Sequence, residues 1–155
     1  MTAATKPLVL GVGNLLMGDE GVGVHVIRKL EAETIPENAT LLDGGTGGFH
    51  LLSLFQEYDP IILIDATMDG KPVGTVTVTQ PRFASDFPRT LSAHDIGLRD
   101  LLESAQLIGS LPGLFLITIS IDTIQSMSME LSEQVARSIP AVVSNVLGVL
   151  RSPEP

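Results

Sequence analysis

The segment from Leu8 to Leu30 constrains the fold more than any other part of this sequence. It begins with Leu8 to Val12, an apolar run that is typical of a buried parallel strand. It ends with apolar residues at the spacing of a helix that packs on a sheet, at Val22, Val26, Ile27 and Leu30. The segment therefore predicts a strand, a glycine-rich turn and a helix, and in open α/β sheets ligands bind at such turns.

The turn, residues 11–20, reads GVGNLLMGDE and lacks the features of the common phosphate loops. A dinucleotide-binding loop needs a third glycine where the helix packs on the strand, and here Gly18 comes too late. A Walker loop needs Lys and then Ser or Thr after its last glycine, but Asp19 and Glu20 follow here. Two carboxylates at this position would repel phosphate, so they either cap the helix N-terminus or bind a cation.

Composition narrows the range of partners and of chemistry. The chain has 155 residues, 44% hydrophobic and 17% charged, as expected for one domain, residues 1–155, whose parallel sheet is covered on both faces. The net charge of -9 argues against nucleic acid or an anionic membrane as a partner. Because cysteine is absent, there is no thiolate nucleophile, and any metal must be bound by oxygen and imidazole.

The N-terminal apolar run has neither the pattern of a signal peptide nor that of a membrane span. Gly13 and Asn14 interrupt it, and Asp19 and Glu20 stand where a small-residue cleavage site is expected. No uninterrupted apolar stretch reaches the roughly 18 residues needed to cross a bilayer. We therefore expect a soluble protein of the cytoplasm.

The rest of the chain predicts alternating strands and helices. Strands are expected at 39–43, 61–65 and 114–121, and helices at 51–58, from Ser92 onward and at 132–150. Residues 74–78 alternate polar and apolar side chains and follow strand 61–65 after a short turn, so we expect an edge strand antiparallel to its neighbours. The predicted fold class is α/β, a three-layer α/β/α sandwich with a mixed, mostly parallel sheet.

Three side chains that could carry chemistry are expected at one edge of this sheet. Glu20 follows the first strand, Asp65 ends strand 61–65, and His94 lies in the first turn of the helix that begins at Ser92. A helix N-terminus keeps an imidazole neutral, so the three could bind a hard cation or a transition metal. Each also has a structural interpretation, since Asp65 could bond turn N–H groups and His94 could be a solvated residue.

Asp43, which ends strand 39–43 before a glycine-rich loop, could take part in chemistry or simply start an Asx-turn. His50 follows that loop and could approach the same crevice. His25 is five residues from Glu20, about 140° around the helix, and should face elsewhere. The sequence has no Gly-x-Ser-x-Gly, no His-Glu-x-x-His and no cysteine, so the common serine, zinc and thiol hydrolase sites lack their parts.

Four motifs, taken together, resemble those of the nickel-iron hydrogenase maturation endopeptidases. They are GVGNLLMGDEGVG at 11–23, LDGGT at 42–46, IDA at 64–66 and SAH at 92–94, in the family's order and over most of the chain. The resemblance implies an α/β/α fold with a mixed five-stranded sheet. Residues 119–125, ISIDTIQ, depart from the glycine- and proline-containing segment that is common in the family.

The resemblance also implies an activity and roles for particular residues. Family members remove a short C-terminal extension from the precursor of the hydrogenase large subunit after nickel has been inserted. Glu20, Asp65 and His94 fall on the family's metal-contacting positions, and Asp43 falls on the acid of its glycine-rich loop. The implied enzyme is a metal-assisted endopeptidase whose catalytic residues are Asp43, Glu20 and Asp65.

The implied cofactor is nickel supplied by the substrate, although other divalent metals could occupy the site. The expected partner is the large-subunit precursor, bound transiently by a monomer, with neither nucleic acid nor a membrane involved. Two other functions stay open at this point. One is a non-catalytic, metal-dependent checkpoint that binds the nickel-loaded subunit, and the other is a small nucleotide-binding domain, which the acids at the phosphate position disfavour.

Overall fold

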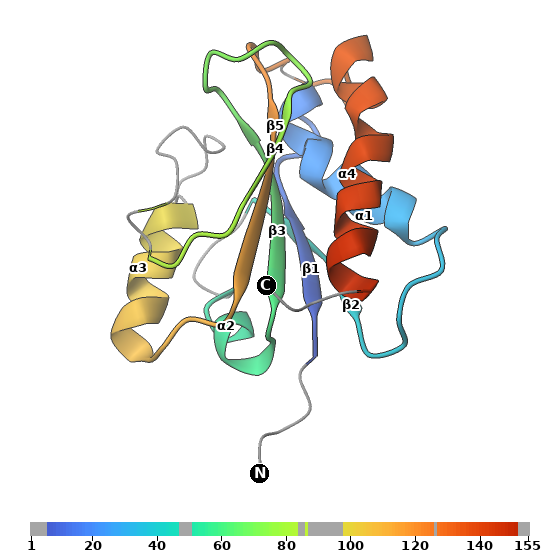
Figure 1. The fold of residues 1–155 in the computed structure, drawn as a ribbon. Coiled ribbons are helices and arrows are strands. Elements are labelled where there is room, and N and C mark those ends of the chain that lie inside the picture. The colour runs from blue at the N-terminus through green and yellow to red at the C-terminus, as the bar shows by residue number, and fades with distance from the viewer. Residues whose placement is uncertain (1–5, 47–50, 84–85, 87–97, 126, 152–155) are drawn as a thin grey trace.

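The computed structural model describes residues 6–46, 51–83, 86, 98–125 and 127–151 (Figure 1). Within these residues, a five-stranded sheet has the order β2-β1-β3-β5-β4. The strands are β1 (Leu8–Val12), β2 (Thr40–Gly45), β3 (Ile61–Thr67), β4 (Val76–Thr79) and β5 (Leu114–Ser120). All neighbouring pairs are parallel except β4 with β5, which is antiparallel. The mixed sheet with an antiparallel edge strand is confirmed, and β3 lies at its centre.

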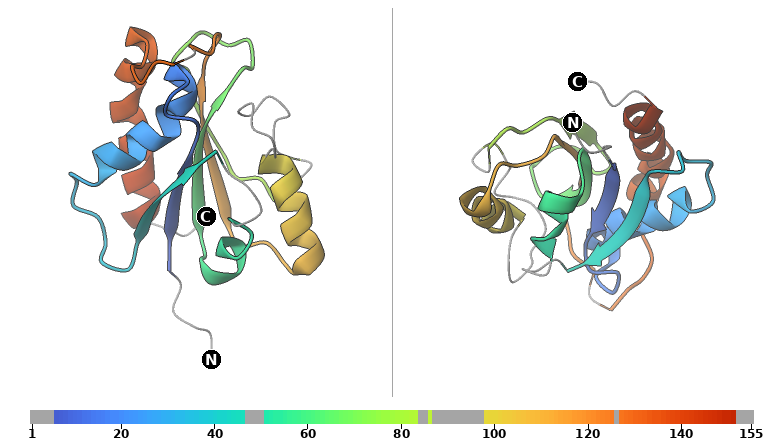
Figure 2. Two further views of the ribbon diagram at one scale, coloured as in Figure 1. Left: turned by 180° about the vertical axis from the view of Figure 1, so that it is seen from behind. Right: turned by 90° about the horizontal axis from the view of Figure 1, so that it is seen from below.

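Helices cover both faces of the sheet, which confirms the three layers (Figures 1 and 2). α1 (Val22–Leu30) and α4 (Glu133–Arg151) lie on one face, and α2 (Leu54–Glu57) and α3 (Leu98–Ile108) lie on the other. A short 3-10 helix, η1 (Gly18–Gly21), comes directly before α1. Among the described residues, none of the helices combines the length and the apolar character needed to cross a membrane.

The predicted helix at 51–58 is shortened in the structure to the four residues of α2. Ahead of it the chain forms tight turns, in which the N–H groups of Phe55 and Gln56 bond carbonyl groups three residues back. Leu51 and Phe55 are nevertheless buried. The apolar spacing therefore predicted which side chains face the core, with Leu54 and Tyr58 only partly buried, but overestimated the length of the helix.

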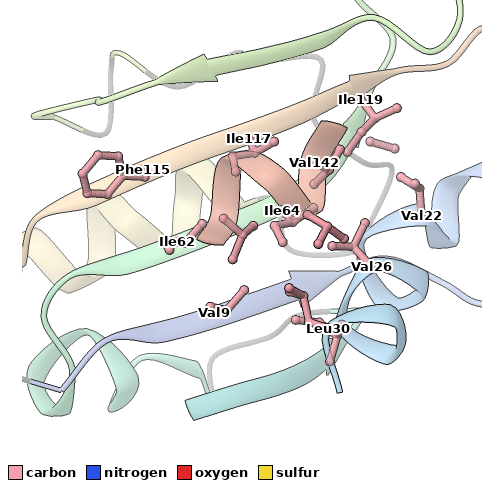
Figure 3. Close-up of a cluster of buried hydrophobic side chains, with 14 of the residues drawn as sticks. Val9, Val22, Val26, Leu30, Ile62, Ile64, Phe115, Ile117, Ile119 and Val142 are labelled. Carbon is pink, nitrogen blue, oxygen red and sulfur yellow. The ribbon is translucent and has the colours of Figure 1, made fainter. Parts of the chain in front are cut away.

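The core consists of one apolar cluster on each face of the sheet. Figure 3 shows the larger cluster, in which side chains of β1, β3 and β5 meet those of α1 and α4, among them Val9, Ile62, Ile64, Ile117, Val26 and Val142. The smaller cluster packs the alternate residues of the same strands against α2 and α3. This alternation is the period of two that places successive strand side chains on opposite faces.

Two strands continue past the aspartates on which they were expected to end. β3 runs to Thr67, because its pairing with β5 continues through the partners Thr67 and Ser120. β2 runs to Gly45, which pairs with β1 across an irregularity in the register. Asp65 and Asp43 each lie two residues inside a strand, so the prediction that the strands end on them is wrong by two residues.

Glycines let the start of α1 lie directly on the sheet. A Cβ on Gly11 of β1 would lie 2.2 Å from the carbonyl oxygen of Gly23 in α1. A Cβ on Gly23 would lie 2.5 Å from the carbonyl oxygens of both Val12 and Ile64. Real Cβ atoms do not approach backbone atoms this closely, so only glycine permits this contact between helix and sheet.

Substituting Gly23 should therefore destabilise the fold. The methyl group of Gly23→Ala would push α1 away from β1 and β3, and we expect a loss of about 1–3 kcal/mol in the free energy of unfolding, as for other overpacked sites. The measurement is urea denaturation followed by circular dichroism.

Gly148→Ala is the matched control, because Gly148 lies in α4 with open space around its Cα. The same added methyl group should there stabilise the protein by about 0.5–1 kcal/mol. Wild-type stability in Gly23→Ala would contradict the close contact of α1 with the sheet.

Candidate functional site

Asp65 lies in the central strand where the α3 face of the sheet changes from apolar to polar. It continues the series of Ile61 and Leu63, which pack in the cluster with α2 and α3. Its side chain is 0% exposed, and its Oδ1 accepts a hydrogen bond of 2.8 Å from the N–H of Ala66. This bond to a neighbouring N–H agrees with the structural interpretation of Asp65, since a fully buried carboxylate depends on hydrogen bonds or on a cation.

Further polar side chains are buried next to Asp65. Thr118 on β5 is in register with Asp65, and Ser120 is in register with Thr67. All of these residues are buried. The Oγ of Ser120 donates a hydrogen bond of 2.8 Å to Oδ1 of Asp69. Sequence reasoning missed this polar patch because it ended the strand at Asp65.

Glu20 lies in η1, the short helix that follows the glycine turn after β1. η1 contacts β3, and Gly13 lies so close beneath it that a Cβ there would be 2.2 Å from the carbonyl oxygen of Glu20. The side chain of Glu20 is only 2% exposed. Burial raises the pKa of its carboxyl above the ordinary value of 4.5. A carboxylate in this setting gains from a proton or from a metal cation that neutralises it.

Asp19, the neighbour of Glu20, has a structural role that differs from the capping considered above. Neither η1 nor α1 has a side-chain hydrogen bond at its N-cap. Instead, Oδ1 of Asp19 accepts a hydrogen bond of 2.7 Å from the N–H of Ser132, the residue before α4. Its Oδ2 accepts one of 3.3 Å from Nε2 of Gln125. Asp19 therefore stabilises a remote segment, and the interpretation that it caps its own helix is wrong.

Asp43 lies on the edge strand β2 and is exposed. Its Oδ1 accepts a hydrogen bond of 2.8 Å from the N–H of Gly45, which is the Asx-turn that was one of its two interpretations. β2 pairs with β1, and β1 pairs with β3, so one strand separates Asp43 from the strand of Asp65. The turn orients the Asp43 carboxylate at the solvent-facing side of the sheet edge.

The predicted histidines are only partly covered by the structure. His94 and His50 lie outside the described residues, whereas His25 lies in α1. Within the part of the chain that is described, no three His, Cys, Asp or Glu side chains gather so as to hold a metal ion. Glu20 in η1, which follows β1, and Asp65 in β3 lie near the carboxyl ends of two neighbouring strands.

A hollow opens beside the same edge of the sheet, between the β3–β4 connection and the end of β5. It has a volume of about 480 Å³ and is lined by Met68, Gly70, Lys71, Pro72, Val73, Ile121 and Asp122. Met68 comes directly after the last residue of β3, and Asp65 is not among the residues that line the hollow. Its lining combines apolar side chains with two charged ones, Lys71 and Asp122.

Comparison with known proteins identifies the family of this fold and site. Residues 24–149 match the family model of the hydrogenase maturation proteases. The chain belongs to the hydrogenase maturation protease family. The matched range contains Asp43, Asp65 and His94, whereas Glu20 precedes it.

Relatives of this family match the chain over nearly its whole length. The hydrogenase expression/formation protein HupD of Rhizobium leguminosarum bv. viciae is 34% identical over 96% of this chain and 76% of its own length. The hydrogenase 2 maturation protease of Escherichia coli is 33% identical over 93% of this chain and 90% of its own length. Other relatives are longer, and the chain spans 55% of HupD from Rhodobacter capsulatus.

Solved structures of the family share the fold described above. The hydrogenase maturating endopeptidase HybD of E. coli has a TM-score of 0.86 and 31% identity, and the match covers 96% of this chain and 94% of HybD. The hydrogenase 2 maturation peptidase of Thaumarchaeota archaeon SCGC_AB-539-E09 has a TM-score of 0.74 and 32% identity, with 95% and 99% covered. The family and the fold inferred from the four sequence motifs are confirmed.

His25 should make the stability of the fold depend on pH. Burial lowers the pKa of His25 below its ordinary value of 6.5, and the charge of Arg28 adds to this effect, while a hydrogen bond to the backbone of Met129 opposes it. The unfolded chain therefore takes up the proton at a higher pH than the folded chain does. The stability that neutral His25 provides is present above pH 6.5 and is lost as the pH falls through the lowered pKa.

The variant His25→Asn, which stays neutral, should thus lose less stability on acidification than the wild-type protein. The measurement is the free energy of unfolding from urea denaturation at pH 7.5 and at pH 5. Because both proteins share every other titrating group, the difference between their pH slopes isolates His25. Equal slopes would show that the pKa of His25 is not lowered in the folded protein.

Proposed function

We propose that this protein is an endopeptidase that removes the C-terminal extension from the nickel-loaded large-subunit precursor of a nickel-iron hydrogenase. The observation that carries the proposal is the pair of buried carboxylates, Glu20 and Asp65, at the carboxyl edge of a hydrogenase maturation protease fold. Buried carboxylates are costly unless a cation or a hydrogen-bond network compensates them. A cation that arrives with the substrate would add to this compensation by neutralising the two negative charges.

The donor set fits a metal that the substrate carries. Carboxylate oxygen and imidazole nitrogen suit nickel and other divalent first-row metals. Glu20 and Asp65 supply the oxygens, and His94 is proposed as the third ligand. A site with few protein ligands leaves coordination positions for those of the precursor. Thr118 is in register with Asp65, so a polar side chain lies beside the carboxylate charge on the neighbouring strand.

The proposed reaction is hydrolysis of one peptide bond. A substrate-borne metal held by Glu20, Asp65 and His94 would polarise the scissile carbonyl, and the Asp43 carboxylate positions a water molecule and takes up its proton. The hydroxide oxygen forms the new bond to the carbonyl carbon, the C–N bond breaks, and the leaving amine receives the proton. The Asx-turn at Gly45 supports this role, because it fixes the orientation of Asp43 on an exposed edge strand.

The net charge and the family suggest the compartment, the oligomeric state and the kind of partner surface. We infer that the enzyme acts in the cytoplasm as a monomer that binds its precursor transiently. The excess of acidic residues, 18 Asp and Glu against 9 Lys and Arg, favours a basic surface on the precursor over nucleic acid or an anionic membrane.

Asp65→Asn should abolish processing without unfolding the protein. The amide keeps the size of the side chain, and its oxygen can still accept the hydrogen bond from Ala66, but the charge that attracts a cation is lost. We expect a decrease of at least about 100-fold in the cleavage rate, comparable to the loss of one strong electrostatic contact to the transition state. The measurement is mass spectrometry of the precursor over time, with the melting temperature as the check on folding.

The control is Asp100→Asn, which removes the same charge from an exposed position in α3. It should process the precursor at the wild-type rate. Unchanged cleavage by Asp65→Asn would remove Asp65 from the proposed site.

Cleavage should also depend on nickel in the precursor. The enzyme is prepared free of metal and mixed with precursor made with or without nickel. Because the metal-binding residues are few, we expect cutting of the nickel-loaded form and little cutting of the nickel-free form. Efficient cutting of the nickel-free precursor would contradict a substrate-borne metal, and binding without any cutting would indicate the checkpoint function instead.

A further inference from the structure

Asp19 connects the glycine turn to the segment between β5 and α4. Besides the two bonds that its carboxylate accepts from Ser132 and Gln125, its own N–H donates a bond of 2.9 Å to Oε1 of Gln125. Asp19 is only 1% exposed. We call this set of three hydrogen bonds among Asp19, Gln125 and Ser132 the latch.

Backbone contacts of the neighbouring residues reinforce the latch. The N–H of Gly18 donates to the carbonyl of Ser128 at 2.7 Å, and the N–H of Ser128 donates to the carbonyl of Leu16 at 2.9 Å. Gly18 also makes room for Gln125, since a Cβ at this position would lie 2.3 Å from its Oε1. The turn that carries Glu20 is therefore attached along its length to residues more than 100 positions later in the chain.

The latch constrains Glu20 because the two acids are adjacent in η1. A 3-10 helix has three residues per turn, so the side chains of Asp19 and Glu20 point about 120° apart. With Asp19 held toward α4, the direction of Glu20 is determined by the same four-residue helix. Both carboxylate oxygens of Asp19 already accept hydrogen bonds from N–H groups. Asp19 therefore has a structural role, whereas Glu20 is the proposed metal ligand.

We propose that Asp19 is a positioning residue, which acts through the latch to hold Glu20 in the orientation that metal binding requires. The proposal rests on the proposed function for its catalytic readout, because Glu20 acts there as a metal ligand. It also makes Gln125 part of the functional machinery. Loss of the latch should leave the sheet intact but let η1 rotate, so that Glu20 no longer meets the metal.

Exchanging the hydrogen-bonding groups of the latch provides the test. In Asp19→Asn the new amide N–H group faces the N–H of Gln125, and in Gln125→Glu two carboxylates face each other. Each single variant should therefore lose the contact. In the double variant Asp19→Asn/Gln125→Glu the amide donates to the new carboxylate, while the bonds to Ser132 and from the N–H of residue 19 can persist.

We expect each single variant to lower kcat for the nickel-loaded precursor by about 100-fold, as for a small misplacement of a catalytic group, with little change in KM. The double variant should recover most of the wild-type kcat. A second readout needs no proteolysis: addition of Ni²⁺ alone should broaden the amide NMR signals of η1 in the wild type and the double variant, and much less in the single variants.

Leu150→Ala is the control for a general loss of stability. Leu150 is buried in α4, 17 residues after the start of that helix and so about 25 Å from the latch. The substitution should lower the melting temperature, but kcat and the nickel response at the assay temperature should equal those of the wild type. The double variant could instead recover the melting temperature but neither kcat nor the nickel response. That result would overturn the positioning role of Asp19.

Failure of this inference can be told apart from failure of the proposed function. If the wild-type protein does not cut the nickel-loaded precursor, the proposed function fails, and the Ni²⁺ titration still decides on the latch. A nickel response that is the same in the single variants and the wild type, or absent in all of them, would overturn the role of Asp19. Wild-type kcat in either single variant would do so as well.

Discussion

The close contact between the start of α1 and the central strands is the constraint on which the rest of the structure depends. Gly11, Gly13 and Gly23 allow backbone to lie against backbone, at distances that leave no room for a Cβ. η1 is consequently held over the carboxyl ends of β1 and β3, with Glu20 buried beneath it. Side chains at these positions would lift the helix and expose Glu20 to water, which would remove the raised pKa that burial gives it.

The acidic side chains at this edge differ in burial and in hydrogen bonding. Asp19 and Asp65 are each buried and bonded to backbone N–H groups, while Asp43 is exposed and held by an Asx-turn. Burial strengthens the interaction of a carboxylate with a cation, because the local dielectric constant is low. Exposure gives Asp43 access to water. The same type of side chain therefore stabilises a remote segment at Asp19, while at Asp65 and Asp43 its surroundings suit the proposed metal-binding and proton-transfer roles.

Repeating apolar patterns allowed most of the fold to be predicted from the sequence. β1 was predicted to the residue, and the antiparallel edge strand followed from the short turn before β4. The four-residue length of α2 and the two extra residues of β3 depend on hydrogen bonds to distant backbone or to tight turns, which local periodicity does not encode. The predicted places of Asp43 and Asp65 within their strands were wrong for this reason.

The sequence by itself determined the family, the three-layer fold and the candidates Glu20, Asp65, His94 and Asp43, because each depends on residues close together in the chain or on ordered motifs. Tertiary structure alone decided what Asp19 does. Its partners Gln125 and Ser132 lie 106 and 113 residues away, between β5 and α4. Only the folded sheet brings the ends of β1 and β5 to the same edge, with β3 between them, and a carboxylate bonds whichever donors that arrangement places within reach.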